Sequence, residues 1–199
     1  SGSGLTIATT GKVYSAGNGS SIGNLTGATG DYVVVTDAGS LWDLANLNLT
    51  IGMVTSITNY LTITQSGTVD NVAMLVVATN NFVNLLGGTL GVAGGTYSNG
   101  PFVVGDGVQS ATLKSLAGPA MNFLTGLLIT NNATLCGAGT VGGGSLGVTL
   151  TNGAIVTPGV NGAGSLTIGG SNLMWASGVV YRCEITNLFL PPGVGWDVL

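Results

Sequence analysis

Short stretches of alternating apolar and polar residues recur along most of this chain and predict β-strands. Residues 32–35 and 47–51 are two clear examples. In an extended strand successive side chains point to opposite faces, so Leu, Ile and Val would lie inside and Thr and Ser outside. The stretches end at two or three Asn, Gly, Ser or Asp residues, which tolerate the positive φ angles of tight corners.

The strand-and-corner pattern repeats along the chain. Residues 129–135 and 150–156 share the order apolar, Thr, Asn, Asn or Gly, Ala and two β-formers, at an offset of 21 positions. Looser copies begin at Val35 and Ile63, and Leu-Thr-Ile recurs at Leu5, Leu49, Leu61 and Leu166. Such a period fits one coil of a parallel β-helix, in which each coil pairs with the next. At roughly 20–24 residues a coil, we expect about eight to ten coils and a rod of ~40–45 Å.

The predicted fold is therefore all-β: one β-solenoid domain over residues 1–199, with little or no helix. Residues 1–60 would form looser N-terminal coils, 61–126 middle coils with longer loops, and 127–199 the regular repeat coils. Residues 40–47 have the length of two helical turns, but the alternation on both sides favours strands. A helix over residues 69–86 stays open as an alternative.

The composition is unusual in its lack of charge. Only 5% of residues are charged and 36 are Gly, against about 25% charged residues in a typical soluble domain. Lys12, Lys114 and Arg182 are too few to follow a phosphate backbone, which argues against nucleic-acid binding. The abundance of β-branched residues argues against disorder. Asp70 and several Asn residues interrupt the most apolar stretch, so no transmembrane helix is expected.

Catalytic chemistry finds little support in the residue inventory. The chain has no His, which excludes His-activated nucleophiles and His-ligated metals. Its best carboxylate cluster is Asp31, Asp37 and Asp43, which we expect to cap backbone amides at corners. No cofactor or metal site is predicted, and the chain is expected not to be an enzyme.

Two further patterns have a structural and a functional interpretation. The pairs Thr62/Thr64 and Thr149/Thr151 suggest ice binding, but two isolated pairs are better explained as outward Thr on strands. The aromatic residues could form a sugar-stacking face, which keeps surface glycans open as partners, although the solenoid core is the favoured place for them. These residues are Trp42, Trp175, Trp196, Tyr14, Tyr32, Tyr60, Tyr97 and Tyr181.

Cys136 and Cys183 are the two cysteines. An even count in an exported chain allows one disulfide, and two free buried thiols are the alternative. A Cys136–Cys183 bond would close a long loop and connect neighbouring coils.

The second half of the chain resembles the autotransporter-associated β-strand repeats of bacterial surface proteins. The resemblance rests on the phrases at residues 127–135, 137–141, 151–159 and 164–169, with a weaker likeness at 88–90 and 102–107. It implies a right-handed parallel β-helix, exported to the cell surface or beyond, that serves as a stalk, adhesin or matrix component. No outer-membrane barrel or sorting signal lies within the sequence, so the resemblance does not indicate an export route.

The two ends suggest how such a rod would be used. Monomeric solenoids hide their terminal coils under polar caps, and neither end of this sequence offers a charged capping helix. The leading hypothesis is thus a structural subunit that stacks head-to-tail on copies of itself into an extracellular filament or surface layer. The alternatives are a monomeric passenger segment of an autotransporter-like adhesin and, more distantly, a glycan-processing β-helix enzyme. The candidate end-to-end contacts are Leu188, Phe189, Leu190, Trp196 and Val198.

Overall fold

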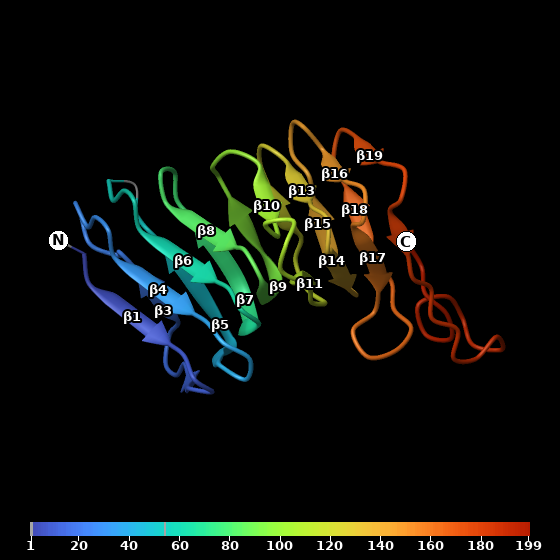
Figure 1. Ribbon diagram of the computed structural model, residues 1–199, viewed down its shortest axis with the longest axis horizontal. Helices are drawn as coiled ribbons and strands as arrows, with labels where there is room; N and C mark the ends of the chain where they lie inside the picture. The colour runs from blue at the N-terminus through green and yellow to red at the C-terminus, as the bar shows by residue number, and fades with distance from the viewer. Residues whose placement is uncertain (1, 54) are drawn as a thin grey trace.

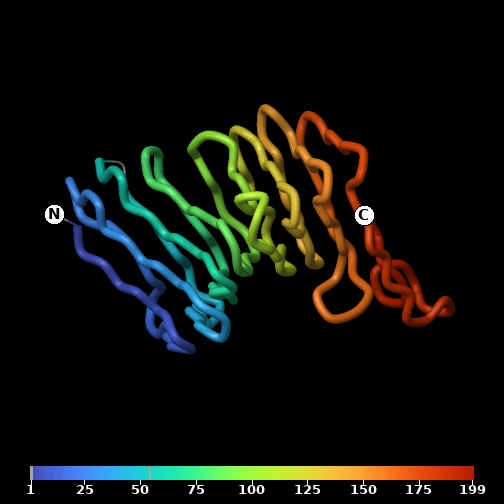
Figure 2. The backbone as a smooth tube through the Cα atoms, viewed as in Figure 1, coloured from blue at the N-terminus to red at the C-terminus, as the bar shows by residue number. Residues whose placement is uncertain are grey.

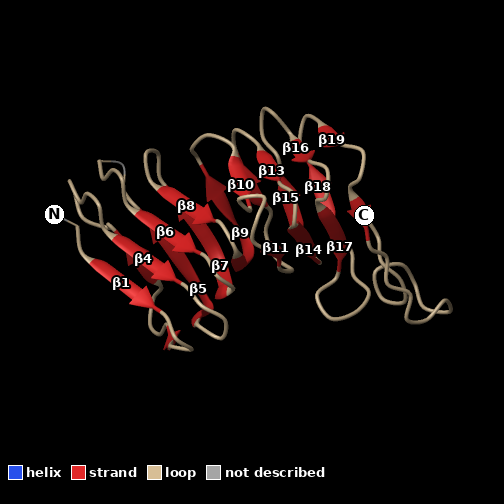
Figure 3. Ribbon diagram, viewed as in Figure 1, coloured by secondary structure: helices blue, strands red, loops and turns tan. Residues whose placement is uncertain are grey.

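The computed structural model describes residues 2–53 and 55–199, which form a parallel β-helix of about seven turns. Its strands wind around a common axis with the N-terminus at one end and the last coil at the other (Figure 1). The described residues contain strands, turns and loops but no helix (Figure 3). The predicted fold class is confirmed. The open question over residues 69–86 is settled in favour of strands.

The first face of the solenoid is an eight-stranded parallel sheet, here called sheet A. Each of its strands comes from a different coil and pairs with the strands of the adjacent coils. In order along the axis these are β1 (Gly4–Ile7), β4 (Tyr32–Val35), β6 (Tyr60–Ile63), β8 (Phe82–Leu85), β10 (Phe102–Val104), β13 (Leu127–Ile129), β16 (Val148–Leu150) and β19 (Leu173–Trp175).

The remaining strands form sheet B, which covers two further faces. On the second face lie β2 (Lys12–Tyr14), β5 (Leu41–Ile51), β7 (Gly67–Val77), β9 (Gly88–Tyr97), β11 (Ala111–Ser115), β14 (Ala133–Gly137), β17 (Ile155–Pro158) and β20 (Val180–Tyr181). The third face contains β3 (Ser20–Ile22), β12 (Met121–Phe123), β15 (Thr140–Gly142) and β18 (Thr167–Gly169), together with the C-terminal halves of β5, β7 and β9.

The coils differ in length, which explains why the predicted count of eight to ten was slightly high. Gly4 pairs with Tyr32, and Tyr32 pairs in turn with Tyr60. These first two coils are several residues longer than the later coil that brings Ile129 beside Leu150. The uniform period assumed from the sequence therefore fits only part of the chain. The tube in Figure 2 shows the successive coils and the larger loops that leave them near the C-terminal end.

The core consists of apolar columns that run along the axis. In sheet A, one column joins the equivalent residue of every coil, and the four copies recognised in the sequence, at Val35, Ile63, Ile129 and Leu150, all fall in it. All four side chains are fully buried. Parallel pairing in register stacks equivalent side chains one strand spacing apart, about 4.8 Å, so the sequence repeat becomes a continuous core.

Candidate functional site: the open ends of the solenoid

The N-terminal end of the solenoid is an open coil. Among the described strands, β1 pairs only with β4, and β2 and β3 pair only with β5. A hollow of about 540 Å³ opens between these strands. Trp42 lies in its wall with apolar side chains such as Leu5, Val13 and Ile22, and Ser15 and Ser20 are among its polar groups.

Hydrogen bonds hold the Trp42 side of this hollow in place. The Trp42 indole Nε1–H donates to Ser15 Oγ at 3.0 Å, and Ser15 Oγ lies 2.7 Å from Ser20 Oγ. Trp42 is thereby fixed with its ring packed on the core and its polar atom satisfied.

The first core column of sheet A is covered in the middle of the rod and open at both ends. Leu5, in the first coil, is 44% exposed, while its neighbour Val33 is 7% exposed. At the other end Leu173 is also 44% exposed, while its neighbour Val148 is 1% exposed. Each terminal residue therefore lacks the coverage that the next coil gives to the internal members.

The same loss of coverage affects two more columns at the C-terminal end. Trp175 is 41% exposed although its neighbour Leu150 is fully buried. Tyr181 of β20 is 39% exposed, whereas Val156 beneath it is fully buried. The last coil thus presents Leu173, Trp175 and Tyr181 as an apolar surface facing along the axis.

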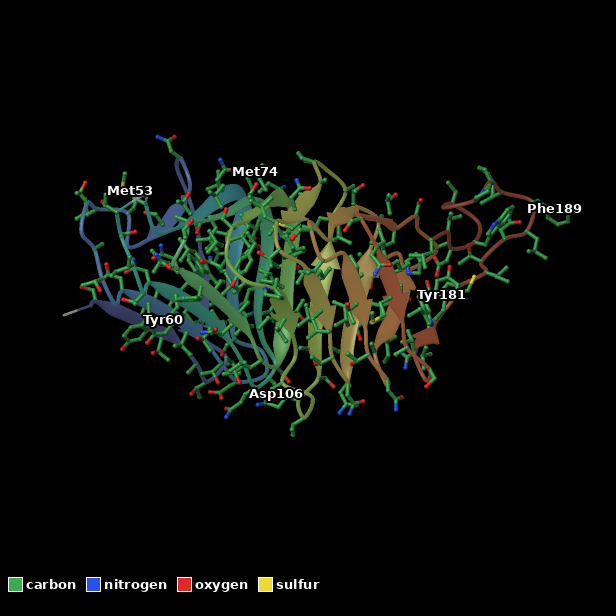
Figure 4. The ribbon with its side chains drawn as sticks, turned by 90° about the horizontal axis from the view of Figure 1, so that it is seen from above. Met53, Tyr60, Met74, Asp106, Tyr181 and Phe189 are labelled. Carbon is green, nitrogen blue, oxygen red and sulfur yellow. The ribbon has the colours of Figure 1, made fainter. Side chains whose placement is uncertain are left out.

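The C-terminal tail extends this end surface. Phe189 is 99% exposed, and in Figure 4 it lies at the extremity of the rod, beyond Tyr181. Leu188 and Leu190 are exposed beside it. Trp196 and Val198, by contrast, are partly covered by other parts of the chain. The Trp196 backbone pairs with Ile185, and the Val198 backbone pairs with Ser165, just before β18.

A buried carboxylate anchors this tail. Asp197 accepts hydrogen bonds from the backbone N–H groups of Gly164 and Glu184, each at 2.8 Å. It is only 5% exposed. A carboxylate satisfied by backbone donors on two segments fixes their relative position, so the tail has a defined path although its tip is exposed. Nothing in the sequence pattern singled out this residue.

Three other carboxylates, Asp31, Asp37 and Asp43, accept hydrogen bonds from backbone amides, as predicted. Asp31 Oδ1 accepts from the Ser3 N–H at 2.6 Å, and Asp37 Oδ2 accepts from the Thr9 N–H at 3.0 Å. Asp43 accepts from the Ala45 N–H at 2.8 Å and from Asn71 Nδ2 at 2.9 Å. Within residues 2–53 and 55–199, no three His, Cys, Asp or Glu side chains are grouped to share a metal ion.

The Cys136–Cys183 disulfide that the even cysteine count allowed is not formed. Cys136 on β14 is a buried free thiol and Cys183, just after β20, is an exposed one. β17 lies between their strands, so the two backbones are separated by about two strand spacings, ~9.6 Å. A disulfide requires Cα atoms within about 7 Å. Burial raises the pKa of the Cys136 thiol to about 11.

The aromatic residues divide between core and surface. Trp42 and Tyr97 are buried, as the favoured core interpretation expects, and Tyr97 meets Phe102 edge-on at 5.0 Å. That interpretation is wrong for Tyr14, Trp175 and Tyr181, which are exposed. Tyr32 and Tyr60 stack on each other on the outer face of sheet A, with ring centroids 5.4 Å apart and planes 9° apart. Because each ring covers a face of the other, this pair offers less open aromatic surface to a sugar than its position suggests.

One outward row was missed in the sequence. Thr68, Thr89, Thr112 and Thr134 lie in register on neighbouring strands of the second face. The Thr62/Thr64 and Thr149/Thr151 pairs noted in the sequence lie elsewhere: Thr62 and Thr149 are on β6 and β16 of sheet A, and Thr64 and Thr151 directly follow these strands. Since coil lengths vary, no constant offset in the sequence connects the four. A single row does not make the two-dimensional array that the ice-binding hypothesis needs.

No protein-family model matches the chain, no curated protein matches it, and no solved structure matches it. A search of the described residues for a helix that is long and apolar enough to cross a membrane finds none.

Proposed function

We propose that this chain is a non-catalytic structural subunit that stacks head-to-tail, through the two open ends of its solenoid, into an extracellular bacterial filament or surface layer. The resemblance to bacterial surface repeats supports the extracellular location. The stacking is supported by one observation above all: the first core column of sheet A is buried within the rod and 44% exposed at both of its ends, at Leu5 and at Leu173.

Covering these ends would be favourable. Complete burial of a large apolar side chain stabilises by about 1.5–3 kcal/mol, so each half-covered residue has roughly half of that still to gain. Leu5, Leu173, Trp175 and Tyr181 lie on the surfaces that a second copy would cover. Phe189 and its neighbours at the tip of the tail would add a contact on one side of the joint.

The direction of the strands favours an open filament over a closed pair. All strand pairs between named elements are parallel, so a second copy that continues the sheets must point the same way along the axis. Such a joint brings the C-terminal end of one copy onto the N-terminal end of the next. A head-to-tail contact of this kind repeats indefinitely unless its rotation closes a ring.

The alternative is a passenger segment of an autotransporter-like adhesin. Exposed terminal columns are equally compatible with a segment whose solenoid continues in neighbouring sequence. The two hypotheses differ in what the isolated chain does: a subunit polymerises through its ends, whereas a passenger segment stays monomeric.

Sedimentation velocity over a range of protein concentrations separates them. We expect the parent chain to form species that grow with concentration, and Leu5→Lys or Trp175→Lys to prevent this by placing a charge on an end column. Val108→Lys is the matched control, because Val108 is 79% exposed on the loop between β10 and β11. Added in trace amounts, Leu5→Lys should shorten the parent polymers, because only its C-terminal end remains competent.

A parent chain that stays monomeric at every concentration would contradict the proposal and favour the passenger alternative. Polymers that tolerate both end substitutions as well as Val108→Lys would show that assembly uses another surface.

A further inference from the structure

We infer that the joint between two copies has one defined register, in which β1 of a copy pairs in parallel with β19 of the preceding copy and β2 pairs with β20. Leu5 then stacks on Leu173, Ile7 on Trp175, and Val13 on Tyr181. This inference rests on the proposed head-to-tail assembly and specifies its partner surface.

The hydrogen-bonding phase of β19 determines which of its groups are free. The Val148 N–H donates to the Asn172 carbonyl at 2.8 Å, and the Ala176 N–H donates to the Leu150 carbonyl at 3.0 Å. Backbone groups of successive residues in a strand point alternately to its two neighbours. Asn172 and Ala176 therefore face β16, and the N–H and C=O groups of Leu173 and Trp175 face away from the chain.

β1 has the complementary phase. The Tyr32 N–H donates to the Ser3 carbonyl and the Thr36 N–H to the Ile7 carbonyl, both at 2.9 Å. Ser3 and Ile7 thus face β4, which leaves the backbone groups of Gly4 and Thr6 directed outward. When Leu5 lies opposite Leu173, the free N–H and C=O groups of Leu173 meet those of Gly4 and Thr6. The same arrangement joins β13 and β16, where the Leu127 N–H donates to the Gly147 carbonyl at 3.0 Å.

Other registers fail on this geometry. A shift by one residue would set the outward-facing groups out of phase and turn the core side chains to the surface. A shift by two residues keeps the phase but places Ile7 on Leu173 and leaves Trp175 without a partner. Only the register with Leu5 on Leu173 continues both core columns of sheet A.

The second face supports the same register independently. The Val180 N–H donates to the Ala154 carbonyl and the Arg182 N–H to the Val156 carbonyl, both at 2.9 Å, so Tyr181 between them faces outward. At the other end the Leu41 N–H donates to the Gly11 carbonyl at 2.9 Å and the Ser15 N–H to the Asp43 carbonyl at 2.8 Å. Lys12 and Tyr14 are therefore the outward-facing residues of β2, which again is the complementary phase.

The corners of the first and last coils match in length. Four residues join β1 to β2 and four join β19 to β20. Both corners close with the same hydrogen bond, from Gly11 N–H to the Ala8 carbonyl at 2.9 Å and from Val179 N–H to the Ala176 carbonyl at 3.4 Å. The residue numbers of Leu173 and Leu5 (173 − 5) and of Tyr181 and Val13 (181 − 13) therefore differ by the same 168. One rigid-body placement of the second copy satisfies both faces.

The third face takes no part in this joint. Val198 pairs in parallel with Ser165, and the Leu166 N–H donates to the Val198 carbonyl at 2.9 Å. The tail thus already covers the start of that edge, immediately before β18.

Engineered disulfides test the register. The side chains of Thr6 on β1 and Met174 on β19 are exposed on the outer surface of the solenoid. The inferred register places these two residues opposite each other, about 4.8 Å apart. That separation suits a disulfide. In a Cys183→Ser background, Thr6→Cys with Met174→Cys should give a ladder of covalent multimers after mild oxidation, resolved by non-reducing electrophoresis.

The matched control is Ala8→Cys with Met174→Cys, which is shifted by two residues and should give little or no ladder. Filaments, seen by electron microscopy, in which only the shifted pair cross-links would overturn the register and leave head-to-tail assembly standing. Filaments in which neither pair cross-links would also overturn the register. A parent chain that forms no filaments would instead overturn the proposed function, and the register with it.

Discussion

Asn59 and Asn81 stack one coil apart inside the solenoid, and the Asn59 amide Nδ2 donates to Asn81 Oδ1 at 2.8 Å. Both side chains are fully buried at the corner that precedes sheet A. Asn81 Oδ1 also accepts from the Asn59 backbone N–H at 3.2 Å, and Asn59 Oδ1 accepts from the Asp31 N–H at 2.9 Å. Side-chain oxygens therefore connect successive coils where the backbone leaves the sheet.

Replacing Asn81 by Ala should destabilise the fold strongly. The Asn81 amide group also donates to the Ser56 and Thr79 carbonyls at 2.9 and 3.0 Å, so the substitution leaves buried partners unsatisfied on two sides. Each unsatisfied buried group costs about 1–3 kcal/mol, and we expect a loss of about 3 kcal/mol or more in the free energy of unfolding. Guanidinium denaturation measures it.

Asn84→Ala is the control for this prediction. Asn84 is an exposed residue of β8 whose side chain donates to Thr62 Oγ1, at 3.2 Å. Its substitution should change the unfolding free energy by less than about 0.5 kcal/mol. Equal effects of Asn81→Ala and Asn84→Ala would show that the buried asparagine stack does not stabilise the corner.

Gly91 makes room for an ion pair between strands that are not neighbours. Lys114 Nζ on β11 contacts Asp70 Oδ2 on β7 at 2.6 Å, and β9 with Gly91 lies between them. A Cβ at position 91 would overlap Asp70 Oδ1 and approach Lys114 Cε to 2.9 Å. Gly91→Ala should therefore displace the pair and lower the unfolding free energy by roughly 1–3 kcal/mol.

The loss should be smaller in a Lys114→Met background, because Asp70 is then free to move away from the new methyl group. We expect a coupling energy of at least about 0.5 kcal/mol in the double-mutant cycle. Gly169→Ala, whose Cβ would meet only the Val141 carbonyl at 3.8 Å, should be tolerated. Strict additivity of Gly91→Ala and Lys114→Met would mean that the ion pair does not span this glycine.

The two cysteines should differ sharply in reactivity. Burial raises the pKa of Cys136 to about 11 from its ordinary 9.0, while Cys183 is exposed. In the native protein at pH 8, a maleimide should label one thiol per chain, and Cys183→Ser should abolish this labelling. Two thiols should react in guanidinium. Rapid native labelling of Cys183→Ser would contradict the burial of Cys136.

The same pKa shift predicts an alkaline loss of stability. Below pH 9.0 the Cys136 thiol is protonated in both states, and its contribution is fully present. As the pH rises through about 11, the unfolded chain ionises first, so stability falls over this window. In a plot of the guanidinium denaturation midpoint against pH, Cys136→Ala should reduce this alkaline fall, whereas Cys183→Ser should leave it unchanged.

Much of the fold could be predicted because the repeat is local. The copies at Val35, Ile63, Ile129 and Leu150 share one core column, since alternation and corner residues act over a few positions. The number of turns was less accessible, because the long N-terminal coils and the shorter later ones obey the same strand pattern and differ only in their loops.

The sequence was less informative about contacts between coils. Lys114 and Asp70 are 44 positions apart and meet across Gly91, and no spacing rule relates them. The pairing state of Cys136 and Cys183 was inaccessible for the same reason, since two cysteines in one solenoid need not lie on adjacent coils. At the ends, the apolar tail was visible in the sequence, but the matching four-residue corners required the register of the strands.

Electron microscopy of the isolated chain, with power spectra from elongated particles, distinguishes head-to-tail stacking from a monomeric rod. Head-to-tail stacking predicts long filaments with a layer line at ~4.8 Å and an axial subunit repeat of ~38 Å, because the eight strands of sheet A are stacked one strand spacing apart. Discrete rods of one subunit's length at every concentration would contradict head-to-tail stacking.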